Sequence, residues 1–120
     1  MDTVAIKSTF ETILKNVPGL HQLLLITDDG FPILTTLEAG DKEGLSTAVG
    51  AILCDSGQRG IRELALGELE AVITIGSNGY FLLARICGET LFMAVASPDA
   101  PLGLLLFRVK RAVPIIRNAL

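Results

Sequence analysis

The chain has 120 residues, a length that suits one domain, here residues 1–120, and is too short for two. Half of its residues are apolar, which excludes intrinsic disorder. Its formal net charge of −3 and its 5% of aromatic residues argue against a nucleic-acid partner, which calls for a basic surface and stacking side chains.

The N-terminal part of the sequence predicts a helix followed by two strands. Pro18-Gly19 ends the helix. Leu20 to Thr27 is apolar on both faces and predicts a central strand, and Asp28-Asp29-Gly30 predicts a hairpin turn. Phe31 to Leu37 is the return strand, which we place at a sheet edge because Pro32 cannot donate a ladder hydrogen bond. The helix stripe that faces the core is Ile6, Phe10, Ile13, Leu14 and Val17.

The rest of the chain predicts a second helix, three strands and a last helix. The second helix runs roughly from Lys42 to Gly57, with a core stripe of Leu45, Val49, Ile52 and Ser56, and the connection after it has no clear form. The strands are Leu69 to Ile75, Tyr80 to Cys87 and Thr90 to Ala96, joined by Gly-containing turns.

The last helix follows Pro101 and turns one apolar face toward the core. Leu104, Phe107 and Ile115 lie off that face. They either pack on the first helix or form a second contact patch, and the sequence leaves both readings open.

These elements predict an α/β chain of the α+β type with the order α-β-β-α-β-β-β-α. Tight turns join the neighbouring strands, so the five-stranded sheet is antiparallel. Because its strands are apolar on both faces, helices should cover both faces.

Residues that could carry catalysis do not form a recognisable set. The sequence has no phosphate-binding glycine loop, no dinucleotide fingerprint and no nucleophile elbow. His21 is isolated in sequence from Cys54, and Asp28-Asp29 fits ordinary turn chemistry. We therefore expect no enzyme activity, no metal and no cofactor, and we expect Cys54 and Cys87 to be free thiols in a reducing compartment.

The second helix is unusual because the face opposite its predicted core stripe carries no charge. Thr47, Gly50, Ala51, Cys54, Gly57 and Gln58 lie on this face. Gly50 costs a helix about 1 kcal/mol relative to alanine, and a close helix–helix contact would offset that cost. We therefore predict that this face is a dimer interface.

Several short motifs together resemble the Roadblock/dynein light chain family. They are Val17-Pro18-Gly19-Leu20, Asp28-Asp29-Gly30-Phe31-Pro32-Ile33, Glu68-Leu69-Glu70 before a strand, and Pro101-Leu102-Gly103-Leu104 opening a helix that contains Arg108 and Arg111. The resemblance implies that the second helix covers one face of the sheet and the two terminal helices cover the other. It also implies a homodimer through the second helix and the third strand, where Glu70, Val72 and Thr74 lie.

The resemblance further implies a non-enzymatic scaffold or regulator of Ras-like small GTPases, with stimulation of GTP hydrolysis among the activities of bacterial members. Charged residues at the ends of the second helix suit partner binding, because rim charges steer association; they are Lys42, Glu43, Arg59, Arg62 and Glu63. The alternative is a small-molecule sensor module, which calls for polar residues at core positions. No run of about 20 apolar residues is present, so we expect a cytoplasmic protein without a transmembrane segment.

Overall fold

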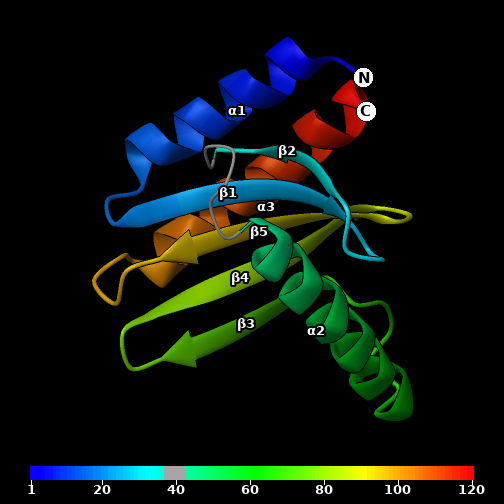
Figure 1. Cartoon of the computed structure of the whole chain (residues 1–120). Helices are drawn as coiled ribbons and strands as arrows, with labels where there is room; N and C mark the ends of the chain where they lie inside the picture. The colour runs from blue at the N-terminus through cyan, green and yellow to red at the C-terminus, as the bar shows by residue number, and fades with distance from the viewer. Residues whose placement is uncertain (37–42) are drawn as a thin grey trace.

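The protein, described from a computed structural model, is a five-stranded antiparallel sheet between two layers of helices (Figure 1). The structure describes residues 1–36 and 43–120, without the side chains of residues 43–46. Along the chain the elements are α1 (Thr3–Asn16), β1 (Leu20–Thr27), β2 (Pro32–Thr35), α2 (Glu43–Glu63), β3 (Ala71–Gly76), β4 (Gly79–Cys87), β5 (Thr90–Ala96) and α3 (Leu102–Ala119). The predicted fold class and element order are confirmed.

The strands lie in the order β2-β1-β5-β4-β3, so β1, β5 and β4 are interior and β2 and β3 are the edges. The interior position of β1 and β5 follows from their apolar residues on both faces, and β2 lies at an edge as Pro32 predicts. Gly79 opens β4 with a φ of 148°, and a Cβ there would lie 2.6 Å from the carbonyl oxygen of Ala96. The β3–β4 turn therefore requires glycine at this position.

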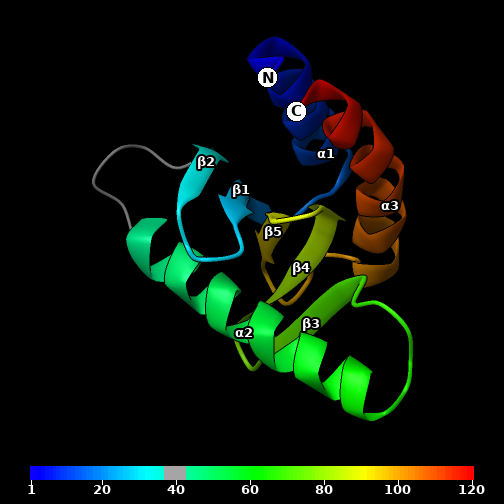
Figure 2. The same cartoon turned by 90° about the vertical axis from the view of Figure 1, so that its right-hand side faces the viewer.

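Helices α1 and α3 lie side by side on one face of the sheet, and α2 lies on the other (Figure 2). The Asp2 side chain caps α1 by accepting a hydrogen bond from the amide of Ala5 at 3.0 Å. The rings of Phe10 and Phe92 meet edge to face, with their centroids 5.6 Å apart. The chain termini lie together, because the amide of Asp2 donates to the carbonyl of Ala119.

Helix α2 is rotated relative to the prediction. Thr47, Gly50 and Cys54 are buried against the sheet, whereas Ile52 is 66% exposed and Ser56 is exposed. The prediction that the uncharged small-residue face points outward and that Ile52 and Ser56 face the core is therefore wrong.

The physical reason is how closely α2 approaches the sheet. A Cβ on Gly50 would lie 2.7 Å from Cδ1 of Ile26, and one on Gly57 would lie 2.9 Å from Cγ2 of Val72. Large residues of the strands fill the space that small residues of the helix leave open. The contact that we predicted between two helices is thus a contact between this helix and its own sheet.

Helix α2 also extends six residues beyond the predicted end, from Gly57 to Glu63. Ile61 packs against the core on this side, one helical turn after Gly57 and two turns after Cys54. Glycines at 57 and 60 hid this continuation, because glycine lowers helix propensity without excluding a helix.

Helix α3 turns one apolar face toward the core, as predicted, and buries Leu105, Val109 and Ile116 there. The guanidinium of Arg117 fixes the helix to β4 by donating from Nε and Nη2 to the carbonyl of Ile86, at 3.0 and 2.8 Å. Of the three residues that the sequence left open, Leu104 packs partly against the core, and Phe107 and Ile115 are 51% and 52% exposed. The contact-patch reading therefore stays open for Phe107 and Ile115.

Candidate functional site

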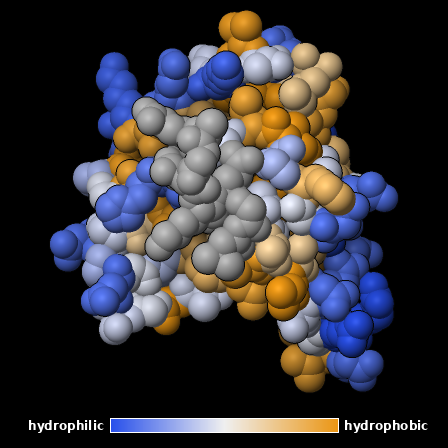
Figure 3. Space-filling model, in the orientation of Figure 1, coloured by the Kyte–Doolittle hydropathy of each residue, from blue (hydrophilic) through white to orange (hydrophobic). Residues whose placement is uncertain are grey.

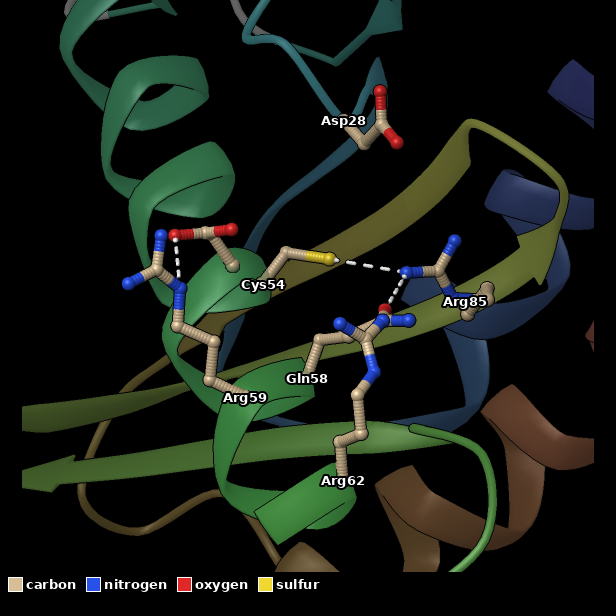
Figure 4. Close-up of a pocket in the computed structure, with 7 residues that line it drawn as sticks. Asp28, Cys54, Gln58, Arg59, Arg62 and Arg85 are labelled. Atoms are coloured by element: carbon tan, nitrogen blue, oxygen red, sulfur yellow. Dashed lines mark hydrogen bonds and ion pairs between the residues drawn. The ribbon is translucent and has the colours of Figure 1, made fainter.

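A polar pocket of about 390 Å³ lies between the C-terminal half of α2 and the ends of β1 and β4 (Figure 4). Asp28 comes from the end of β1 and its turn, Arg85 comes from β4, and the other lining residues come from α2. The full lining is Asp28, Cys54, Asp55, Gln58, Arg59, Arg62 and Arg85.

Arg85 is the structural centre of the pocket. Its Nη2 donates to Oε1 of Gln58 at 2.5 Å and to Sγ of Cys54 at 3.4 Å, and its Nη1 donates to the carbonyl of Gly88. All three partners are neutral, and among the described residues no carboxylate lies within ion-pair distance of this guanidinium. The pocket therefore holds an oriented positive charge beside α2 that forms no ion pair with a carboxylate of the described residues.

Cys54 lies at the bottom of this site and is 3% exposed. Burial raises the pKa of its thiol above the ordinary value of 9.0; Arg85 acts in the opposite direction, and Asp28 and Asp55 add to the increase. The thiol is therefore protonated at neutral pH and donates or accepts only weakly.

The outer rim of the pocket is formed by the last turns of α2. Arg59 pairs with Asp55 one turn earlier, with Nε and Oδ2 3.2 Å apart, and both side chains are mostly exposed. Arg62 points from the helix into the same pocket (Figure 4). Among the described side chains no ion-pair partner of Arg62 is present, so it contributes a second free guanidinium.

The predicted partner-binding residues are only partly described. Lys42 lies outside the described residues, and Glu43 begins α2 but its side chain is not described. Arg59, Arg62 and Glu63 are exposed in the last turns of α2. Hydrophilic residues surround this end of the helix at the lower right of Figure 3, and hydrophobic residues lie at its tip, where Leu64 and Leu66 are exposed.

The predicted dimer-interface residues fall into separate environments. Thr47, Gly50 and Cys54 are buried within the chain, and Ala51, Gly57 and Gln58 are half-buried at the flank of α2. Glu70, directly before β3, is exposed. Within β3, Val72 packs under α2 and Thr74 is exposed.

Arg85 is the functional candidate that sequence reasoning missed. Its signal in the sequence is a single charge in an otherwise apolar strand. The register shift between Arg85 and Cys87 in the β4–β5 pairing lies at the strand end where the side chain turns toward α2.

The residues considered for catalysis and metal binding do not converge on this pocket. His21 lines a separate groove beside the β3–β4 turn and does not take part in the lining of the pocket that contains Cys54. Within residues 1–36 and 43–120 no cluster of three metal-ligating side chains occurs. None of the described helices combines the length and hydropathy that a bilayer crossing requires.

Comparison with known families decides the classification. The model of the Roadblock/LC7 domain matches residues 11–97. The chain belongs to the Roadblock/LC7 family. A comparison with curated protein sequences gives no significant match.

Solved structures of this family have the same fold at low sequence identity. The Roadblock/LC7 domain from Streptomyces avermitilis is 18% identical, with a TM-score of 0.83 over 90% of this chain and 91% of that one. The gliding protein MglB from Thermus thermophilus is 17% identical, with a TM-score of 0.84 over 97% and 88%. An MglB structure with a tetrameric arrangement is 19% identical, with a TM-score of 0.82 over 96% and 90%.

Proposed function

We propose that this Roadblock/LC7 protein is a homodimeric, non-enzymatic regulator that binds a Ras-like small GTPase. The observation that carries the proposal is the family match over residues 11–97, joined by the likeness to MglB structures. The tetrameric arrangement of one MglB supports self-association as a property of such chains. Two exposed regions of this protein suit the two kinds of contact.

The outward face of α2 and the free edge of β3 are the surfaces that we assign to the homodimer. The exposed stripe of α2 consists of four uncharged residues, each one helical turn after the one before it: Ala48, Ile52, Ser56 and Gly60. In the described sheet β3 pairs with β4 alone, so its other edge offers unpaired backbone groups. A symmetric pair that joins both surfaces should bury about 1,200–2,000 Å².

The end of α2 is the surface that we assign to the GTPase. Arg59, Arg62 and Glu63 are exposed there, and Arg62 joins Arg85 in one pocket. Charges at the rim of an interface raise association rates and set specificity more than they raise affinity. An acidic side chain of the GTPase entering this pocket would meet two guanidinium groups that lack an ion-pair partner among the described residues.

The experiment is a titration of fluorescent-nucleotide-loaded Ras-like GTPases from the source organism, in GDP and GTP-analogue forms. We expect one GTPase to bind with a preference for one nucleotide state, and Arg59→Ala/Arg62→Ala to weaken that binding about tenfold. Lys7→Ala on α1 is the matched control and should change nothing. Failure of every GTPase to bind contradicts the proposal.

A single-turnover measurement in the same series separates binding from stimulation of hydrolysis. If Arg62 contributes to transition-state charge, the double variant loses hydrolysis at saturating protein as well as affinity. Unchanged hydrolysis in the saturated complex assigns these arginines to docking alone.

The alternative function, a small-molecule sensor, is favoured by one observation. The polar pocket places Cys54, Gln58 and Arg85 between α2 and the sheet, which is where a sensor of this fold would hold an anionic ligand. A rise in the melting temperature with inorganic phosphate or dicarboxylates that Arg85→Gln abolishes would favour the sensor. An unchanged melting temperature with these anions would favour the regulator.

A further inference from the structure

The charges of this protein are separated between its two faces. Helices α1 and α3 together carry six of the ten lysine and arginine residues and one carboxylate, Glu11, although the whole chain has a net charge of −3. Helix α3 has no acidic residue at all. The face that α1 and α3 form is therefore strongly basic, and it lies on the opposite side of the sheet from α2 (Figure 2).

A groove of about 410 Å³ runs between α1 and α3 on this basic face. Helix α1 contributes Ser8, Thr9 and Thr12 to its lining. From α3 come Arg108, Arg111 and the half-exposed Ile115. Both basic and apolar groups thus line the same groove.

The two arginines of the groove have no anionic partner within the part of the chain that the structure describes. Nε of Arg108 is buried and makes no hydrogen bond there. Both guanidinium groups instead lie over the exposed ring of Phe107, with their Cζ atoms 6.0 Å (Arg108) and 5.5 Å (Arg111) from its centroid. This ring orients the two cations without neutralising them.

The hydroxyl groups of Thr9 and Thr12 on the opposite wall do not compete for an anion. Thr9 donates to the carbonyl of Ala5 at 2.9 Å and Thr12 donates to the carbonyl of Ser8 at 3.0 Å. The hydrogens of these two hydroxyls are therefore engaged within α1, and the charged donors of the groove are the guanidinium groups of Arg108 and Arg111. Planar guanidinium groups match the geometry of carboxylates, which they bind in bidentate fashion.

We propose that the α1/α3 groove is a second docking site, which binds an acidic segment of a partner protein. Carboxylates of the segment pair with Arg108 and Arg111, and its apolar side chains cover Phe107 and Ile115. The concave shape and the buried Nε favour a peptide over a bilayer, whose headgroup plane contacts projecting side chains. A nucleic acid is disfavoured because the exposed ring beside the groove, Phe107, is already covered by two cations.

The test uses the full chain and a fluorescent peptide made of alternating Glu-Glu and Leu-Leu pairs. We expect the peptide to bind and to shift the Nε–H resonance of Arg108 in isotope-labelled protein. Arg108→Gln and Arg111→Gln should each weaken binding about tenfold, since each removes one charge-assisted pair. Raising the salt concentration should weaken binding of the wild type more than that of either variant.

Lys110→Gln is the matched control, because it removes the same charge from α3 on the side away from the groove, where Lys110 lines a different pocket with Val113 and Arg117. It should leave the peptide affinity nearly unchanged, as should replacement of Val4 by glutamine on α1. Circular dichroism establishes that each variant is folded. If Arg108→Gln unfolds the chain, the exposed Arg111→Gln carries the test alone.

Three outcomes overturn the proposal. If Lys110→Gln weakens peptide binding equally, the binding results from the overall charge of this face and not from a specific site. A control peptide in which glutamine replaces every glutamate should not bind; if it binds with the same affinity, the carboxylates have no role. Binding to phosphatidylserine vesicles, or to inorganic phosphate, without binding of the acidic peptide assigns the groove to a lipid surface or to a small anion.

Discussion

The two faces of the sheet are covered in different ways. On the α1/α3 side, large aliphatic and aromatic side chains from both layers interlock, as in the contact of Phe10 with Phe92. On the α2 side, the helix contributes glycine, threonine and cysteine, and the strands supply the bulk through Ile26, Met93 and Val72. A hydrophobic stripe thus identifies the buried face of a helix only where the side chains of the helix, rather than those of the strands, fill the space between helix and sheet.

The largest expected effect comes from removing volume on the α1/α3 side. Phe92 is fully buried, and we expect Phe92→Ala to lower the free energy of unfolding by about 3–5 kcal/mol, because it leaves a cavity. Urea unfolding measures this change. Phe107→Ala is the matched control on the exposed face, and a comparable loss there would contradict the assignment of Phe107 to the surface.

The converse substitution tests the α2 side, where added volume should destabilise. Gly50→Leu should lower the free energy of unfolding by about 1–3 kcal/mol, because the side chain would overlap Ile26 and Met93. Gly103→Leu places the same side chain in α3, where no atom lies within 4 Å of the added Cβ, and should be nearly neutral. A stable Gly50→Leu protein would mean that α2 does not approach the sheet closely.

Unfolding at alkaline pH also distinguishes the two faces of the sheet, because a weak acid is buried on each of them. Burial raises the pKa of Cys54 from 9.0 on the α2 side and the pKa of Tyr80 from 10.0 on the α1/α3 side. A raised pKa favours the neutral form in the folded state. Its contribution is therefore complete below the unfolded-state pKa and is lost as the pH rises through the folded-state pKa.

We accordingly expect the free energy of unfolding to be flat in pH below about 9 with respect to these groups, and to fall above it. Cys54→Ala should reduce the loss of stability that begins at the lowest pH, whereas Cys87→Ala should leave that loss unchanged. A pH profile that is identical for wild type and Cys54→Ala would contradict burial of that thiol.

The smallest effect is expected on the solvated side of α2. Asp55→Asn breaks the ion pair with Arg59, and because both side chains are mostly exposed, we expect a loss within about 0.5 kcal/mol. Thermal unfolding at low and high salt measures it. A loss above 2 kcal/mol would show that this pair is covered, for example by a partner copy.

The fold was largely predictable from the sequence, because strand burial and turn chemistry act locally. Pro32 placed β2 at an edge, and the apolar runs of β1 and β5 placed them inside the sheet. The rotation of α2 was not predictable in this way. Ile52 looks like a core residue by hydropathy, and only the distance between Gly50 and Ile26 shows that the opposite face is buried.

The candidate site was predicted only at its rim. Arg59 and Arg62 were identified because they follow the uncharged part of the helix, and they lie exposed at its end. Arg85 joins them through the strand register, a long-range feature that spacing in the sequence does not report. The basic α1/α3 groove likewise depends on two helices from opposite ends of the chain lying together.

The central claim is that the small residues of α2 pack against its own sheet and that Ile52 lies in the interface with a second copy of the chain. Light scattering at low micromolar concentration tests it directly, because the single chain has a mass of 12.7 kDa. We expect twice this mass for the wild type and the single-chain mass for Ile52→Arg, with the dimer kept in Val4→Arg, which places the same charge on exposed α1. A wild-type monomer, or a dimer that Ile52→Arg leaves intact, would contradict the account.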